Sequence, residues 1–473
     1  MARNRSTGNM AKLIGLVAVV LIAAGFAWHS AGRATGPKIT FLQPTGHIGQ
    51  TGELHLRVAA PGARLKRLDI ALEQGGKHIR LFDLANTADV RVTQETNSVQ
   101  IGRSIGKQSL SQLEAGQATI TVTAARPVLF GLREAVSSAS RELDVDLSPP
   151  TLTVASKFHF LNLGGSEMVV YRVTPATAVS GVRVGDQEYP GFPASGARVS
   201  PADPGLRVAF FALLWNQDSQ TPIELFAHDD VGNEARASFD YRVFPKKFRE
   251  SRITLDDRFL SRVVPQILQN STDLKVDNPG DVLGSFLRIN NDLRHENNDT
   301  IRTVARASEP KILWDGPFRQ LSNTAVEGGF ADQRTYAYQG RVVDHQVHLG
   351  FDLASVTNAP VQAANTGRVA YAAWLGIYGN CVIVDHGMGI QSLYAHMSNI
   401  VVKPGSPVST GQVLGYTGST GLAGGDHLHF TMLLGGNPVT PIDWWSGKWV
   451  HDRILRKLQE ASQDRLAMLR TWE

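Results

Sequence analysis

The chain has 473 residues, of which 42% are hydrophobic and 19% charged, with a formal net charge of +4 and one cysteine. This composition is typical of a globular protein, and the length indicates about three domains. The weak positive charge, without clusters of Lys and Arg among aromatic residues, argues against nucleic acid as a partner. One cysteine excludes an intramolecular disulfide and a C-x-x-C metal site, and Cys381 in the apolar run C-V-I-V is expected to be a core residue.

Residues 1–36 are predicted to hold a short cytoplasmic tail and a membrane anchor or signal. Arg3, Arg5 and Lys12 precede an uncharged stretch, 13–28, which is marginal for a membrane span and slightly long for a signal-peptide core. Basic residues before the stretch place the N-terminus in the cytoplasm and the bulk of the chain across the membrane. We favour an uncleaved anchor, and export after signal cleavage is the alternative.

Two successive β-sandwich domains are expected at residues 37–148 and 149–245. Both contain short stretches of alternating apolar and polar residues between Gly, Pro and Asn breaks, as antiparallel sandwiches do. In the first domain these include I-T-F-L, L-H-L-R-V and R-L-D-I-A-L, and in the second E-M-V-V-Y-R-V, R-V-A-F-F-A-L-L and A-S-F-D-Y-R-V. The turn D-D-V-G-N before the last of these resembles the final hairpin of bacterial immunoglobulin-like domains, so an immunoglobulin-like fold is predicted.

Residues 246–320 are predicted to form a helical connector, because apolar residues recur at spacings of three and four in D-D-R-F-L-S-R-V-V-P-Q-I-L and V-L-G-S-F-L-R-I-N-N-D-L. Glycine-rich β-type segments follow at 321–447. The last segment, 448–473, is expected to be a helix that packs on its own domain. Its apolar stripe consists of Ile454, Leu455, Leu458, Ala461, Leu466 and Leu469. The chain as a whole is predicted to be mostly β.

Candidate functional residues first appear in G-G-D-H-L-H-F-T-M, residues 424–432. In a β-strand, side chains alternate between the two faces, so His427, His429 and Thr431 would point to one face and the apolar residues to the other. Such a pair of imidazoles suits a metal and a group close to it. Two satisfied surface histidines are the alternative, so the pattern needs partners elsewhere in the chain.

The best upstream partner is V-H-L-G-F-D-L-A, residues 347–354, in which His348, Gly350 and Asp352 share one face. In a straight strand His348 and Asp352 would be about 13 Å apart, and a bend or bulge at Gly350 would close that gap. With one downstream histidine, these residues would supply two imidazoles and a carboxylate. That set leaves a fourth position for water on a tetrahedral Zn²⁺ ion.

A third segment, Q-S-L-Y-A-H-M, is expected to place Ser392, Tyr394 and His396 on the polar face. Three strands would then each present a histidine from one side of a sheet. His386 ends a strand at a turn and is interpreted as structural. His345 has no apolar alternation that would place it in the cleft.

These motifs together resemble the M23 metallopeptidases of the lysostaphin and LytM type. The resemblance covers roughly 328–445 and is carried by H-L-G-F-D, G-N-C-V-I-V-D-H-G, S-L-Y-A-H-M, V-K-P-G-S-P-V-S-T-G-Q-V-L-G-Y-T-G-S-T-G and H-L-H-F. It implies an antiparallel β peptidase domain with one Zn²⁺ per chain. The implied zinc ligands are His348, Asp352 and His429, and the implied catalytic residues are His396 and His427.

Thr431 departs from the family pattern, which commonly has Glu after H-L-H-F. Since Thr431 shares the face of His429, the resemblance implies altered surroundings of the metal but no lost ligand.

The function implied by the resemblance is zinc-dependent hydrolysis of the peptide cross-links of peptidoglycan in cell wall remodelling. Peptidoglycan peptides would be the substrate, and the membrane would be contacted through the N-terminal helix. We therefore expect an inner-membrane-anchored protein with its bulk in the periplasm, or an exported one. The alternative function is a non-catalytic, wall-binding regulator or amidase activator. The sequence leaves open which of His396 and His427 is the general base.

Overall fold

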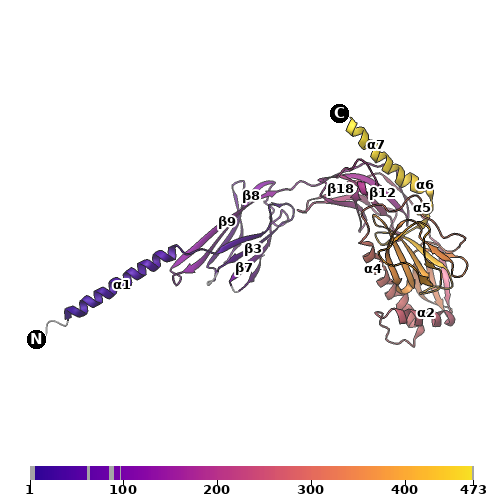
Figure 1. Cartoon of the computed structure of the whole chain (residues 1–473), viewed down its shortest axis with the longest axis horizontal. Helices are drawn as coiled ribbons and strands as arrows, with labels where there is room; N and C mark the ends of the chain where they lie inside the picture. The colour runs from indigo at the N-terminus through magenta and orange to yellow at the C-terminus, as the bar shows by residue number, and fades with distance from the viewer. Residues whose placement is uncertain (1–5, 61–63, 85–89, 96, 471–473) are drawn as a thin grey trace. The chain divides into compact units, whose positions relative to one another are not determined.

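The computed structural model describes residues 6–60, 64–84, 90–95 and 97–470, and the chain in it is mostly β, as predicted. It divides into two compact units, and Figure 1 shows the elements of each. Unit 1 comprises Met1–Pro149 and His228–Glu234, and unit 2 comprises Pro150–Ala227 and Ala235–Glu473.

Unit 1 begins with helix α1 (Ser6–Gly32). Within it, Met10–Gly32 is long and apolar enough to cross a membrane, judged by length and composition. The end of the helix contacts the sandwich that follows, since Arg133 donates a 2.8 Å hydrogen bond to the carbonyl of Trp28 and its guanidinium lies 4.7 Å from the centre of the indole ring. The helix agrees with the predicted anchor or signal.

The rest of unit 1 is a sandwich whose described strands form two sheets, in the orders β1-β3-β7-β6 and β2-β9-β8-β4-β5. The strands are β1 (Lys38–Gln43), β2 (His47–Ile48), β3 (Glu53–Ala59), β4 (Arg67–Gln74), β5 (Lys77–Asp83), β6 (Arg91–Gln94), β7 (Ser98–Ser104), β8 (Gly116–Val128) and β9 (Arg133–Val145). β9 was not predicted, because its sequence R-E-A-V-S-S-A-S-R-E-L-D-V has few large apolar residues and most of its side chains are exposed or half-buried.

Unit 2 opens with a second sandwich, with sheets in the orders β10-β12-β16-β15 and β14-β13-β17-β18 and a parallel pair β11-β19. Its strands are β10 (Thr151–Val154), β11 (His159–Asn162), β12 (Ser166–Thr174), β13 (Val179–Val184), β14 (Gln187–Pro190), β15 (Phe192–Pro193), β16 (Leu206–Ala212), β17 (Ile223–His228), β18 (Glu234–Ser238) and β19 (Tyr241–Phe244), with a 3-10 turn η1 (Ala194–Ala197). The stretch A-S-F-D-Y-R-V, expected to be one strand, is divided between β18 and β19.

The segment predicted to be a helical connector contains helices α2 (Asp257–Asn270), α3 (Val282–Arg288) and α4 (Arg294–Ala305), with a π-helical turn η2 (Ile289–Leu293). It also contains a strand, β20 (Glu250–Leu255), which pairs in parallel with β22 (Asp332–Tyr338). α2 begins after Asp256, whose carboxylate accepts a 2.7 Å hydrogen bond from the amide of Phe259 and so caps the helix.

The C-terminal β domain contains the candidate site. Its largest sheet has the order β21-β24-β32-β28-β27-β26-β30, with β33 beside β32, and the other sheets are β20-β22-β23 and β25-β31-β29. The strands are β21 (Ala325–Gly328), β23 (Arg341–His348), β24 (Phe351–Ala354), β25 (Pro360–Gln362), β26 (Gly367–Trp374), β27 (Asn380–Gly387), β28 (Ile390–Met397), β29 (Asn399–Ile400), β30 (Pro407–Val408), β31 (Val413–Tyr416), β32 (Leu428–Leu434) and β33 (Asn437–Val439), with a 3-10 turn η3 (Gly376–Tyr378).

The chain ends in helices α5 (Pro441–Trp445), α6 (Gly447–Val450) and α7 (Arg456–Arg470), with a π-helical turn η4 (His451–Leu455). Ile454 and Leu458 are buried, as the apolar stripe predicted, whereas Leu455 is 38% exposed. A buried ion pair also anchors this end: the ammonium of Lys457 lies 2.9 Å from a carboxylate oxygen of Glu167 on β12. The side chains of Leu466 and Leu469 lie outside the described residues.

Candidate metal centre

Asp352 and His429 are brought together by the pairing of β24 with β32. The two strands are antiparallel, and their register places Asp352 directly opposite His429. Directly opposed side chains lie on the same face of a sheet. Oδ1 of Asp352 is accordingly 3.1 Å from Nδ1 of His429.

His348 reaches the same point because the chain bends between β23 and β24. Nε2 of His348 lies 2.9 Å from Oδ1 of Asp352 and 3.0 Å from Nδ1 of His429. The bend passes through Gly350, as predicted. A Cβ atom there would overlap Oγ1 of Thr431 and would lie 2.5 Å from Nε2 of His429, so the close approach of the backbone requires glycine.

The three donor atoms are spaced as a tetrahedral zinc ion requires. Their separations of 2.9, 3.0 and 3.1 Å are near the value of about 3.3 Å for tetrahedral ligands that each lie about 2.0–2.1 Å from the ion. Exposure of the three residues is only 7%, 9% and 5% for His348, Asp352 and His429. Two imidazoles and one carboxylate are a donor set found in catalytic zinc sites, so these residues fit Zn²⁺.

Hydrogen bonds fix which nitrogen of each ligand histidine carries the proton. Nδ1 of His348 donates to the carbonyl of Gly329 at 2.9 Å, which leaves the Nε2 lone pair directed at the cluster. The hydroxyl of Thr431 donates to the carbonyl of Leu349 at 2.8 Å and lies 3.0 Å from Nε2 of His429. Because a hydroxyl has one proton, it accepts from Nε2–H of His429, and Nδ1 keeps its lone pair.

The surrounding histidines favour an ionised Asp352, and burial favours a neutral His429. Arg334 donates from Nη2 to Oδ2 of Asp352 at 2.9 Å, which leaves Oδ1 facing the histidines. Burial would raise the pKa of Asp352, but the surrounding histidines, His348 first, bring that pKa well below its usual value. Burial also lowers the pKa of His429 to about 4. Both groups are therefore in the protonation state that metal binding needs.

His396 reaches the cluster by a route that strand alternation does not predict. In the pairing of β28 with β32, Ala395 is opposite His429 and Tyr394 is opposite Phe430. The prediction that Ser392 and Tyr394 share the histidine face is therefore wrong. His396 has a left-handed φ of 64°, which breaks the alternation and turns the imidazole to the cluster, with ring centroids 5.0 Å from His427 and 5.7 Å from His429.

Each of these two further histidines has Nδ1 bound to a backbone carbonyl. Nδ1 of His396 donates to Thr420 at 2.8 Å, and Nδ1 of His427 donates to Gly425 at 2.9 Å. Both keep Nε2 as the available nitrogen, and Nε2 of His427 lies 3.4 Å from Oδ1 of Asp352. Burial lowers the pKa of His396 well below its usual value, whereas at His427 the effect of burial is outweighed by Asp352, which raises the pKa.

Other residues singled out in the sequence lie away from the cluster. His386 donates from Nδ1 to the carbonyl of Thr366 at 2.8 Å, and its Nε2 lies 2.7 Å from Oγ of Ser392. His345 is exposed and lies 3.2 Å from Oγ1 of Thr335. Cys381 is buried in the core, and burial raises the pKa of its thiol. These outcomes agree with the predicted structural roles of His386 and Cys381.

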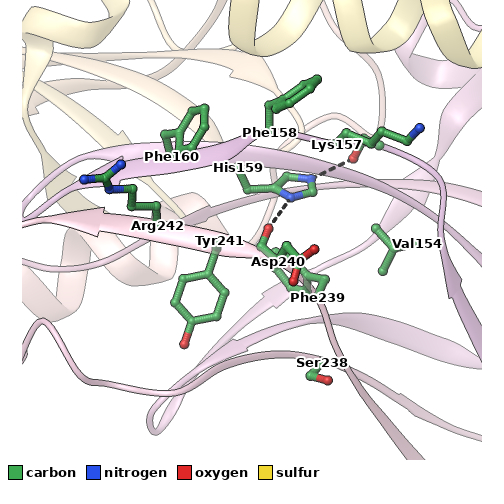
Figure 2. A pocket seen from close by; sticks show the side chains of 11 residues that line it. Val154, Lys157, Phe158, His159, Phe160, Ser238, Phe239, Asp240, Tyr241 and Arg242 are labelled. Carbon is green, nitrogen blue, oxygen red and sulfur yellow. Dashed lines mark hydrogen bonds between the residues drawn. The ribbon is translucent and has the colours of Figure 1, made fainter.

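A cavity of about 560 Å³ lies on the second sandwich and shares no residue with the His–Asp cluster. It is lined in part by aromatic and basic side chains, among them Phe158, Tyr241 and Arg242. Figure 2 shows His159 among the lining side chains, with a hydrogen bond to Asp240. Nδ1 of His159 donates to the carbonyl of Asp240 at 2.9 Å, and its Nε2 lies 2.9 Å from Oγ of Ser156. Both nitrogens are used within the fold, so this histidine has no ligand-binding position left.

Apart from Thr431, the sequence did not indicate the groups that orient the cluster. Four of them are backbone carbonyls, at Gly329, Leu349, Thr420 and Gly425, which no residue type reveals. Arg334 stands in the alternating strand D-Q-R-T-Y-A-Y, and nothing in that pattern distinguishes it from a solvent-facing arginine.

Comparison with known proteins identifies this domain. Residues 346–441 match Peptidase family M23. Over 97 residues the chain is 38% identical to the DD-carboxypeptidase/endopeptidase Mpg of Neisseria meningitidis, a match that covers 20% of this chain and 22% of that protein. It is 28% identical over 166 residues to the peptidoglycan DD-endopeptidase ShyA of Vibrio cholerae, covering 35% of this chain and 36% of the relative.

A third relative is named as an activator of hydrolases rather than as a peptidase. The chain is 37% identical over 95 residues to the murein hydrolase activator EnvC of Escherichia coli, with 20% of this chain and 23% of EnvC covered. Among solved structures, one described as a putative peptidase M23 from Pseudomonas aeruginosa is 19% identical to this chain, with a TM-score of 0.35. The alignment covers 57% of this chain and 88% of the chain in that structure.

The matches span about a fifth to a third of the length of these curated relatives. The family match at residues 346–441 contains His348, Asp352 and His429. The chain therefore carries a peptidase domain of family M23.

Proposed function

We propose that this protein is a zinc-dependent endopeptidase that hydrolyses the peptide cross-links of peptidoglycan. The observation that supports this most directly is the convergence of Nε2 of His348, Oδ1 of Asp352 and Nδ1 of His429 within 2.9–3.1 Å of one another. The substrate class is carried over from the relative named as a peptidoglycan DD-endopeptidase.

In this proposal His348, Asp352 and His429 hold one Zn²⁺ ion. When bound, zinc acidifies water and polarises a carbonyl group. Hydrogen bonds orient the donor atoms before a metal binds. Gly329 and Thr431 hold the two imidazoles in the required tautomers, and Arg334 donates a hydrogen bond to the other oxygen of Asp352. Little rearrangement is then needed on metal binding.

His396 and His427 are proposed as the catalytic residues. Each has Nδ1–H bound to a carbonyl, so each offers Nε2 to the reacting groups. One of them would accept the proton of the attacking water, and the other would stabilise the developing oxyanion or supply the proton that the leaving amine needs. With two imidazoles 5.0 Å apart, both roles are within reach of a single scissile bond.

The proposed location is the cell envelope. α1 would anchor the chain in the inner membrane with its bulk in the periplasm, where the substrate is, or it would be removed as a signal during export. The apolar window Met10–Gly32 supports either route.

The test uses the full-length chain purified in detergent. Zinc per chain is measured by atomic absorption, and purified sacculi are digested with the parent and with His396→Ala. We expect about one zinc per chain in both, and new free amino groups and shortened peptides with the parent alone. A parent protein that binds zinc but leaves the sacculi uncut would refute the endopeptidase proposal.

The similarity to EnvC makes a non-catalytic regulator the second candidate. A regulator would bind sacculi or stimulate an added amidase without cutting peptides itself. Adding a purified amidase to the same digestion separates the two functions, because stimulation by His396→Ala as strong as that by the parent would support the regulator.

A further inference from the structure

The two proposed catalytic histidines depend on one loop, residues 419–425. Nδ1 of His396 donates to the carbonyl of Thr420 near the start of the loop, and Nδ1 of His427 donates to the carbonyl of Gly425 at its end, at 2.8 and 2.9 Å. A shift of the loop would therefore turn both imidazoles, whereas the hydrogen bonds of His348 and His429 go to Gly329 and Thr431 outside it.

The loop's own sequence restrains only its first half. Oγ1 of Thr420 donates to the carbonyl of Met397 at 2.9 Å and accepts from the amide of Asn380 at 3.0 Å. Gly424 and Gly425 follow, and a Cβ atom at either position would meet nothing within 4 Å. Two successive glycines with open space at the Cβ position have wide conformational freedom, so this half needs a restraint from outside the loop.

Helix α2 supplies that restraint. Arg262 donates from Nη2 to the carbonyls of Ala423 and Gly424 at 2.7 and 3.3 Å, and from Nη1 to Ser419 at 3.5 Å. Four residues later on the same helix face, Oε1 of Gln266 accepts from the amide of Gly421 at 3.1 Å. The guanidinium of Arg262 and the side-chain amide of Gln266 thus hold the loop at its beginning, middle and end.

α2 is itself held in place by apolar packing against the domain core. Its buried face, Leu260, Val263, Val264 and Ile267, packs in the same apolar cluster as Leu375 and Ile377 of the neighbouring turn, with Leu422 of the loop against that cluster. The amide of Leu422 donates to the carbonyl of Ile377 at 2.9 Å. The helix is therefore fixed to the core and holds the loop in a fixed position relative to it.

We infer that α2, which precedes the matched family region by 76 residues and more, is a positioning element of the active site, with Arg262 and Gln266 as its positioning residues. This inference rests on the proposed function. Arg262 and Gln266 hold the 419–425 loop so that its carbonyls direct Nε2 of His396 and His427 at the reacting groups. The metal ligands are held independently.

The decisive variant is the double substitution Arg262→Ala with Gln266→Ala. A misplacement of about 1 Å at reacting groups costs up to about 100-fold in rate. We expect kcat on a soluble cross-linked muropeptide dimer to fall at least about 10-fold, while KM and zinc per chain stay within about 2-fold of the parent. Arg262→Lys, which keeps a donor for the carbonyls, should retain most of kcat. Arg258→Ala, an exposed arginine one turn earlier on α2, serves as the matched control.

Hydrogen exchange of the 419–425 amides is followed in the same samples. The expected result is faster exchange in the double variant, with unchanged exchange in β28 and β32. This measurement tests whether α2 restrains the loop, whether or not the parent cuts peptidoglycan. A parent without activity would refute the proposed function alone. An active parent whose double variant keeps the parental kcat, or a loop whose exchange does not change, would overturn the positioning role of α2.

Discussion

Asp352 and His429 are directly opposite each other on neighbouring antiparallel strands, and their facing ligand atoms are 3.1 Å apart. A metal site built on strand register is rigid, because neither residue can move without disturbing the sheet. The third donor, His348, comes from another sheet, so the cluster also ties two sheets together.

Asp352→Asn should abolish zinc binding. An amide oxygen carries no charge, and the half-buried Arg334 would lose Asp352 as an ionic partner and be left with Asp332. We expect zinc per chain, measured after dialysis against a weak chelator, to fall from about one to below about 0.1, with the β signal in circular dichroism retained. His345→Ala, which removes an exposed histidine of β23, should keep the parental zinc content.

Thr431→Val should weaken zinc binding although Thr431 is not a ligand. The substitution removes the acceptor for Nε2–H of His429 and the donor to the carbonyl of Leu349, so the tautomer and the ring orientation are no longer fixed. Loss of such a supporting bond typically costs about 10–100-fold in metal affinity. Competition with a fluorescent chelator measures the affinity, and Thr431→Ser, which keeps the hydroxyl, should stay within about 3-fold of the parent.

Gly350→Ala should damage both stability and the metal site. The added methyl group would overlap Oγ1 of Thr431 and meet Nε2 of His429 at 2.5 Å. Overpacking of this kind costs about 1–3 kcal/mol of unfolding free energy, and we also expect reduced zinc content. Gly329→Ala is the control, because a Cβ atom there would meet nothing within 4 Å. Chemical denaturation of both variants measures the loss of stability. Equal denaturation midpoints for Gly350→Ala and Gly329→Ala would contradict the close approach at Gly350.

Unit 2 should lose stability as the pH rises through the range in which Asp443 ionises. Burial, before all other causes, raises the pKa of this 7%-exposed carboxyl to about 6. The folded state therefore binds the proton more tightly than the unfolded state, whose pKa is about 3.9. Stability from this group is complete below about pH 4 and is lost as the pH rises towards about 6 and above, by up to about 3 kcal/mol.

Asp443→Asn isolates that contribution, since the amide is neutral at every pH. Relative to the parent, the variant should gain unfolding free energy between pH 4 and pH 7, as measured by urea denaturation at both values. Glu167 and Lys246 also act on Asp443, and both are unchanged in the variant. A difference between variant and parent that is the same at both pH values would contradict the raised pKa.

The sequence by itself determined the class of the fold and the residue types of the site. Alternation and breaks predicted a mostly β chain, and basic residues before an apolar stretch predicted the segment that forms α1. The spacing of His348, Gly350 and Asp352 predicted a bend, because a straight strand would separate the two donors too widely. These inferences succeeded because they depend on neighbours in the chain. The boundaries of the six expected segments, the immunoglobulin-like fold and the roles of the five site residues stay predictions.

Tertiary structure alone decided which groups hold the site. Strand alternation put His396 on one face with Tyr394, but a left-handed residue imposed by the surrounding fold reversed that arrangement. Thr431 acquired its role from a carbonyl 82 residues away in sequence, and Arg262 from carbonyls more than 150 residues away. Backbone carbonyls are the same at every residue, so no sequence pattern marks the ones that orient a histidine; only the long-range packing of helices and strands brings them to it.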